Sequence, residues 1–211
     1  MTPRRLPRSF FARPTLTVAK DVLGMVLVHH APDGLTAGRI VEVEAYIGED
    51  DPACHAAPGP TARNAPLYGP PGVAYVYLNY GLHCLMNVVT ERRGFPAAVL
   101  LRALEPLDGL PLMQRRRVAH GAPTHRVTAD TICQGPGNLS VAMGITLAQN
   151  LTDLLRATLY LEDRGLAAID VSWTPRIGIR VGTGHKWRAV DARSRAIARA
   201  PSGRDYADST G

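Results

Sequence analysis

The amino-acid sequence predicts a single α+β domain. Its 211 residues are enough for one domain that buries its own core without help from disulfides or metals. Several apolar runs have the length and alternation of β-strands, and two of them are joined by a turn typical of a hairpin. Other segments space their apolar residues as helices do, and no internal repeat or second domain is visible.

The first predicted elements lie close together near the N-terminus. Thr17 is the expected N-cap of a short helix through Leu23, and Gly24 stands where helices often end. A strand is expected at 25–30, and the sequence Pro-Asp-Gly at 32–34 predicts a turn after it.

The next strand, which begins at Arg39, has two different faces. One face is apolar and carries Val41, Val43, Ala45 and Ile47. The other face carries Glu42, Glu44 and Tyr46. Same-face neighbours on a strand lie about 7 Å apart. Two carboxylates and a phenol would therefore line one edge of any cleft that this face borders. A strand that faces water would also explain them, and the pattern alone leaves both interpretations open.

A long loop and a hairpin follow. Residues 48–72 are rich in Gly and Pro and are expected to form a surface loop, and loops of that length commonly carry function. The runs 73–77 and 82–89 are expected to pair as a hairpin through 78–81, a turn with a glycine available for positive φ. This arrangement places Tyr80 at the hairpin tip.

The remaining chain is expected to contain both strands and helices. The predicted elements are a strand at 97–103, helices at 107–118 and from about 135 to Met143, and strands at 159–162 and 176–181. The glycine-rich start at 135–138 could hold a phosphate on its amides, but it also fits an ordinary helix start. In this scheme residues 1–13 form a basic flexible arm, 14–192 the folded domain and 193–211 a disordered tail.

The chain is basic, with a formal net charge of +6 and a pI near 9.6. Nearly all of the positive charge is arginine, whose planar fork suits phosphate, and Lys20 and Lys186 are the only lysines. Such a surface attracts polyanions and makes nucleic acid a leading candidate partner. A genomic bias toward arginine codons would give the same composition.

Other features bear on the compartment and on the chemistry that the sequence excludes. The cysteines Cys54, Cys84 and Cys133 lack C-x-x-C spacing and are expected to be reduced. No apolar run approaches the roughly 20 residues that span a bilayer, and no secretion signal is visible. We therefore expect a soluble, intracellular protein. Phosphate-loop, dinucleotide-binding and zinc-enzyme motifs are absent, so no metal or cofactor is expected.

Aromatic side chains accompany the carboxylates in the sequence. The aromatic candidates are Tyr46, His55, Tyr77 and Tyr80, and Arg102 is a lone cation in an apolar strand. A base extruded from duplex DNA needs stacking partners, polar contacts at its edges and a side chain that fills the gap left behind. Each need has a candidate here, although a tyrosine taken singly is more often a packing residue.

Several separated blocks, in the same order, resemble one protein family. They are FARPTLTVAKDVLG, RIVEVEAYIGEDDPACHA, TARN, PGVAYVYLNYGLHCLMNVV, LLRALEPLDGL, QGPGNLSVAMGI and PRIGI. They cover most of the chain and make it similar to the alkyladenine (3-methyladenine) DNA glycosylase family. The resemblance implies a curved, mostly antiparallel sheet with a protruding β-hairpin. It also implies a monomeric enzyme without a cofactor that acts on double-stranded DNA containing damaged purines.

The resemblance implies roles for individual residues. Glu44 matches the general base that activates water, and Arg102 matches an arginine that helps to hold this water. Tyr46, His55 and Tyr77 match the base pocket, Asn87 matches an asparagine that clashes with the amino group of guanine, and Tyr80 matches the intercalating tyrosine. The implied reaction flips purines such as 3-methyladenine, 7-methylguanine, hypoxanthine and ethenoadenine, and hydrolyses the N-glycosidic bond to leave an abasic site.

The chain departs from the family pattern near its C-terminus. Trp187 and Arg188 are followed by Ala189 where the family usually has an aromatic residue, and the register after Ile179 is not fixed by the pattern. Neither departure touches Glu44. The scarcity of lysine predicts hydrolysis without strand nicking, because a lyase typically needs an amine.

Two other functions are compatible with parts of the sequence. A non-catalytic damaged-base sensor of the same fold would bind and flip bases without hydrolysis, but the presence of Glu44 argues against it. An RNA-binding module with a tyrosine platform would explain the charge but not the isolated carboxylate. Strong preference for single-stranded RNA would favour that module.

Overall fold

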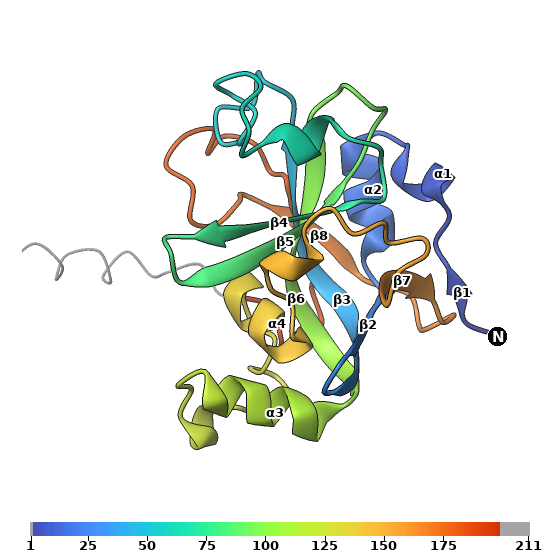
Figure 1. The fold of residues 1–211 in the computed structure, drawn as a ribbon, viewed down its shortest axis with the longest axis vertical. Helices are drawn as coiled ribbons and strands as arrows, with labels where there is room; N and C mark the ends of the chain where they lie inside the picture. Colours follow the sequence, from blue (N-terminus) through green and yellow to red (C-terminus); the bar gives the residue numbers. More distant parts are fainter. Residues whose placement is uncertain (1, 199–211) are drawn as a thin grey trace, which may run out of the picture.

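An open antiparallel sheet forms the centre of the protein (Figure 1). The computed structural model describes residues 2–198, and nine strands of this part form the sheet. The strands are β1 (Arg4–Arg5), β2 (Val26–Ala31), β3 (Gly34–Ile47), β4 (Ala74–Asn79), β5 (His83–Val89), β6 (Ala97–Asp108), β7 (Leu159–Asp163), β8 (Val171–Thr174) and β9 (Arg188–Asp191). Their order is β1-β7-β2-β3-β6-β5-β4, with β9 beside β3 and β8 beside β9. The two ends of this order do not pair, so the sheet does not close into a barrel.

Helices surround the sheet. They are α1 (Arg8–Phe11), α2 (Thr15–Val22), α3 (Leu110–Ala119) and α4 (Pro136–Met143), with short 3-10 turns η1 (Ala65–Tyr68), η2 (Thr124–Arg126) and η3 (Leu147–Gln149). Apolar side chains of α2 and α4 join those of β3, β5 and β6 in the main core. The predicted α+β class is thus confirmed, as one domain around one sheet. No helix within residues 2–198 is long and apolar enough to cross a membrane.

Strand β3 lies in the interior of the sheet. It pairs with β6 along one edge, and with β2 and then β9 along the other. Register shifts interrupt its pairing with β6 around Glu42. The irregularity separates Val41, which packs with Ala103 and Ala196, from Val43 and Ala45, which belong to the main core. The predicted apolar face is therefore wrong at Val41, because a bulge breaks the two-residue alternation.

The predicted hairpin is present. Strands β4 and β5 pair from Ala74 with Val88 to Asn79 with His83, and they project to the left in Figure 1. Tyr80 and Gly81 both have positive φ, at 48° and 72°, which reverses the chain tightly at the tip.

The N-terminal residues differ from the flexible arm that the sequence predicts. In the structure β1 pairs with β7, Leu6 and Phe11 are buried, and Arg8 forms an ion pair with Asp153 at 2.9 Å. These apolar and charged anchors hold the segment against the domain. Basic composition alone did not reveal them.

The first helix begins before the predicted cap. Thr17 lies inside α2, which starts at Thr15. The carboxylate of Glu91 accepts hydrogen bonds from the Thr15 amide at 2.6 Å and from its hydroxyl at 2.9 Å. A distant side chain thus satisfies an amide at the helix start, which local sequence rules cannot anticipate.

The predicted strand at 176–181 is wrong. Residues 175–187 have no regular structure, and the late strands are instead β8 and β9. Arg176 directs its side chain into a buried ion pair with Asp51. The other shifts are small: β6 runs on to Asp108, so α3 starts later than predicted.

Part of the predicted C-terminal tail lies within the described residues. Ser194 and Ala196 are buried, and the Ser194 hydroxyl donates a hydrogen bond to Glu105 at 2.6 Å. The Ala198 amide donates to Glu42 at 2.6 Å. Residues 194–198 therefore pack against the sheet, whereas residues 199–211 lie outside the described part of the chain.

Candidate active site

The sheet register assembles a pocket on one of its faces. Tyr46 lies opposite Ala98, Asn87 opposite Leu100, and Tyr75 opposite Asn87, and directly opposite residues of antiparallel strands share a face. The pocket on this face has a volume of about 420 Å³. Its lining includes six of the residues that the sequence singles out: Tyr46, His55, Tyr77, Tyr80, Asn87 and Arg102. Residues separated by up to 56 positions thus meet at one site.

Glu44 lies directly behind the pocket wall. Its carboxylate has no exposed surface and accepts hydrogen bonds from the Tyr46 hydroxyl at 2.8 Å and from the Ile177 amide at 2.7 Å. Arg102 Nη1 lies 3.2 Å from the same oxygen that Tyr46 contacts. All three of these partners line the pocket. The carboxylate is therefore joined to the pocket wall through these three partners.

A second buried carboxylate supports this arrangement. Glu42 Oε1 accepts from Arg102 Nε at 2.7 Å and from Arg188 Nε at 2.8 Å, and its Oε2 accepts from the Ala198 amide. Two carboxylates and two guanidinium groups thus balance each other in a buried cluster. Burial lowers the pKa of Arg102, but the carboxylates of Glu44 and Glu42 raise it by a larger amount. The net shift of this pKa is therefore upward.

His55 and two tyrosines form the aromatic wall. His55 Nδ1 lies 2.9 Å from the Tyr75 hydroxyl, and the His55 ring meets that of Tyr77 edge-on at 4.4 Å. Asn64 anchors the loop backbone by donating to the His55 carbonyl at 2.8 Å. Burial raises the pKa of Tyr75 to about 12, and burial together with Arg63 lowers the pKa of His55. The contact therefore joins a protonated phenol to a neutral imidazole near neutral pH.

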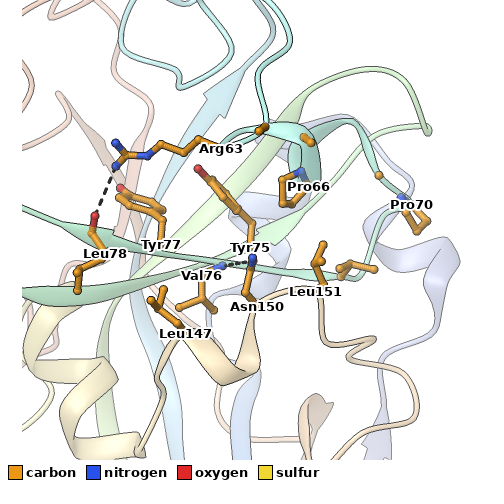
Figure 2. A pocket seen from close by; sticks show the side chains of 14 residues that line it. Arg63, Pro66, Pro70, Tyr75, Val76, Tyr77, Leu78, Leu147, Asn150 and Leu151 are labelled. Atoms are coloured by element: carbon orange, nitrogen blue, oxygen red, sulfur yellow. Dashed lines mark hydrogen bonds between the residues drawn. The ribbon is translucent and has the colours of Figure 1, made fainter. Parts of the chain in front are cut away.

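The aromatic wall has a second pocket on its outer side. Figure 2 shows this pocket, of about 620 Å³, between the loop around Pro66, strand β4 and residues 147–151. Tyr75 and Tyr77 line both pockets. The Arg63 guanidinium lies 5.7 Å from the Tyr77 ring centre and donates to the Leu78 carbonyl at 3.4 Å.

The hairpin tip exposes a tyrosine beside the first pocket, the one that Asn87 and Arg102 line. Tyr80 is 88% exposed, and its neighbour Leu82 is 69% exposed. Its φ of 48° is unusual for a residue other than glycine, asparagine or aspartate. A large aromatic side chain exposed on a tight turn is suited to insertion into another molecule.

Asn87 has a fixed orientation at the pocket floor. It is 5% exposed, and its Nδ2 donates to the Tyr75 carbonyl at 3.2 Å. The chain's departure from the family pattern falls elsewhere. Ala189 lies in β9, opposite Val43, and belongs to the main core rather than to the pocket.

Sequence reasoning missed four residues of the site. They are Asp51, Tyr75, Arg176 and Ile177. Tyr75 could have been found, because it lies two positions before Tyr77 on a strand and so shares its face. The pairing of Asp51 with Arg176 joins positions 125 residues apart and has no local signal.

Comparison with known proteins places the chain among the DNA glycosylases. Residues 9–195 match the family model described as methylpurine-DNA glycosylase. A protein of Methanocella arvoryzae named "Putative 3-methyladenine DNA glycosylase" is 48% identical over 93% of this chain and 97% of its own length. Proteins of the same name from Chlorobium phaeobacteroides and Rhodopseudomonas palustris are 46% and 47% identical, each over 87% of this chain and over 90% and 86% of their own lengths. The chain belongs to the methylpurine-DNA glycosylase family.

Proposed function

We propose that this DNA glycosylase flips alkylated or deaminated purines out of duplex DNA and hydrolyses their N-glycosidic bond with water activated by Glu44. Its substrate class comprises 3-methyladenine, 7-methylguanine, hypoxanthine and ethenoadenine. The observation that carries the proposal is the buried Glu44 carboxylate, whose hydrogen-bond partners Tyr46 and Ile177 both line an aromatic pocket. The pocket volume of about 420 Å³ lies in the ordinary range for small-molecule sites.

The aromatic residues account for capture of the base. Tyr46, His55 and Tyr77 offer faces and edges against which a flipped purine can stack, and Tyr80 fills the gap left in the duplex. Purines methylated at N3 or N7 carry positive charge, which electron-rich rings attract. The amide of Asn87 excludes normal guanine by colliding with its exocyclic amino group.

The reaction follows from the position of Glu44. The carboxylate takes a proton from water while the water oxygen forms a bond to C1′ of the deoxyribose. The bond between C1′ and the purine nitrogen breaks, and its electron pair leaves with the base. A cationic purine departs as a neutral molecule, whereas hypoxanthine also needs a proton. The negative charge of Glu44 further stabilises the oxocarbenium-like sugar, and Arg102 helps to hold the water.

The product is an abasic site without a strand break. A combined glycosylase and lyase typically forms a Schiff base through an amine. Lys20 is exposed on α2 and Lys186 is exposed in the segment before β9, and neither lines the pocket. The enzyme is therefore monofunctional in this proposal, and it acts as a monomer on double-stranded DNA.

Single-turnover excision tests the proposal. A duplex with one hypoxanthine, and a second with 3-methyladenine, is incubated with wild-type protein and with Glu44→Gln in the presence of a chelator. Alkali then reveals abasic sites. We expect excision by the wild type only, with binding retained in the variant and no nick before alkali. Thermal unfolding confirms that the variant is folded. Binding without excision by the wild type would favour the damaged-base sensor, and nicking before alkali would contradict a monofunctional enzyme.

A further inference from the structure

A buried ion pair lies beside the pocket without contacting its contents. Arg176 Nη1 and Nη2 donate to Asp51 Oδ2 and Oδ1 at 2.6 and 2.8 Å, and both side chains are fully buried. This bidentate geometry fixes the guanidinium in both position and orientation. The pair joins two segments that otherwise lack regular structure, the loop after β3 and residues 175–187.

The pair is also tied to the end of β3. Arg176 Nη1 donates to the Ala45 carbonyl at 3.0 Å, and its guanidinium lies 4.7 Å from the ring centre of Tyr46. Asp51 accepts from the Ile47 and Ala53 amides at 3.3 and 3.1 Å. The Arg176 guanidinium thus lies against the Tyr46 ring, which lines the pocket and whose hydroxyl donates to Glu44.

The residue that follows Arg176 provides the link to the proposed chemistry. The Ile177 amide donates to Glu44 Oε1 at 2.7 Å, whereas Tyr46 and Arg102 both contact Oε2. In the part of the chain that the structure describes, the Ile177 amide is the hydrogen-bond donor to Oε1. No strand ladder holds this amide, so its position depends on the anchoring of Arg176.

The surrounding backbone fits closely over the pair. The Gly182 carbonyl accepts from Arg176 Nη2 at 3.4 Å. A Cβ at Gly182 would lie 3.1 Å from that nitrogen and 3.4 Å from Asp51 Oδ1, and the φ of +65° also disfavours a side chain. The segment therefore wraps around the ion pair, which then determines where the following pocket residues lie.

We propose that Arg176, held by Asp51, is a positioning residue for base excision: it keeps the Ile177 amide on Glu44 and the Tyr46 ring in the pocket wall. This inference rests on the proposed function of Glu44. Arg176 touches neither water nor base in this scheme. Its loss should slow the chemical step more than it weakens DNA binding, because small displacements of reacting groups affect rate more than affinity.

Arg176→Lys tests the role, because it keeps the charge and removes the bidentate fork. The matched control is Arg164→Lys, which alters an arginine that also contacts two carboxylates, Asp108 and Glu162, both at 2.7 Å. Three readouts are compared: hydrogen exchange of the Ile177 amide by NMR, single-turnover excision of hypoxanthine, and the Kd for duplex DNA with a tetrahydrofuran abasic analogue. Thermal unfolding verifies that each variant is folded.

We expect Arg176→Lys to speed exchange of the Ile177 amide and to slow excision by about 10- to 100-fold, with Kd changed by less than about threefold. Arg164→Lys should change none of the three readouts. Asp51→Asn replaces Arg176→Lys if the latter does not fold, and the same results are expected. A folded variant with unchanged exchange and excision overturns the inference, as does a fall in excision that only matches a loss of affinity.

Failure of the proposed function is recognised separately. If the wild-type protein excises no purine lesion, this result alone refutes the proposed glycosylase function. The exchange of the Ile177 amide then still decides whether Arg176 holds it on Glu44. Unchanged exchange in Arg176→Lys would overturn the positioning role independently of activity.

Discussion

Substitution of Glu42 should separate stability from chemistry within the buried charge cluster. Glu42 contacts Arg102, Arg188 and the Ala198 amide and has no exposed surface. The change Glu42→Gln keeps the shape of the side chain and removes its charge. Arg102 then keeps Glu44 as a carboxylate partner, whereas Arg188 loses its ion pair with Glu42, so one buried positive charge loses its counter-ion.

The structure sets the size of the effect. Removal of one partner from a buried ion pair costs about 3–5 kcal/mol. For a domain of this size each kcal/mol lowers the melting temperature by about 2–4 °C, so the predicted fall is roughly 6–20 °C. Excision at a temperature where the variant is folded should be reduced much less than in Glu44→Gln. Of the pocket-lining residues Glu42 contacts Arg102, whereas Glu44 contacts Tyr46, Arg102 and the Ile177 amide.

Differential scanning calorimetry and urea unfolding measure this difference. The matched control is Glu105→Gln. Glu105 lies 3.8 Å from Arg39 and keeps 37% of its side chain exposed, and the glutamine oxygen still accepts from the Ser194 hydroxyl, which limits the expected loss to about 1 kcal/mol or less. A melting temperature of Glu42→Gln within about 2 °C of the wild type would refute the view that Glu42 neutralises the cluster. Loss of excision in the folded variant, as complete as in Glu44→Gln, would refute its purely supporting role.

Three further predictions concern the aromatic wall, the hairpin tip and the effect of pH. Tyr80→Ala should weaken binding to lesion-containing duplex by roughly 5- to 150-fold without lowering the melting temperature, because Tyr80 is 88% exposed; equal affinity by fluorescence anisotropy would contradict insertion. Tyr75→Phe removes the hydroxyl that lies 2.9 Å from His55 Nδ1 and should slow excision of hypoxanthine by about 2- to 12-fold. Excision of cationic 3-methyladenine should be slowed less, and equal effects on the two rates would count against a role in base recognition. Burial lowers the pKa of His29, whose Nδ1 lies 2.7 Å from the Met143 carbonyl, so the unfolded chain binds a proton at higher pH than the folded protein and stability falls as pH drops below about 6.5. Urea midpoints at pH 7.5 and 5.5 should therefore differ less in His29→Gln than in the wild type, and an identical pH dependence would exclude His29 as a cause.

Local patterns in the sequence account for much of the fold. The alternation along β3 correctly placed Glu44 and Tyr46 on one face, because the strand is regular from Val43 to Ile47 and repeats every two residues there. The turn composition likewise located the hairpin and Tyr80 at its tip. These features depend on neighbouring residues only, so a single sequence contains enough information to predict them.

The elements that escaped prediction depend on residues far apart in the chain. The start of α2 depends on Glu91, 76 positions from Thr15. Arg176, in the irregular segment 175–187, binds Asp51, which lies 125 positions away in the sequence. Charged and capping partners of this kind come together only in the folded chain.

The interior location of β3 has a consequence for changing what the enzyme accepts. Because β3 is paired along both edges, the strand that carries Glu44 should be among the last to open in native-state hydrogen exchange. The walls of the pocket come partly from the loop around His55 and from Ile177 to Ile179, which belong to no strand. In the proposed function, exchange of the loop around His55 between family members should thus transfer part of the base preference, while Ile177, whose amide donates to Glu44, stays in place. In this proposal, a part of the base selectivity lies on a loop that is separate from the strand that carries Glu44.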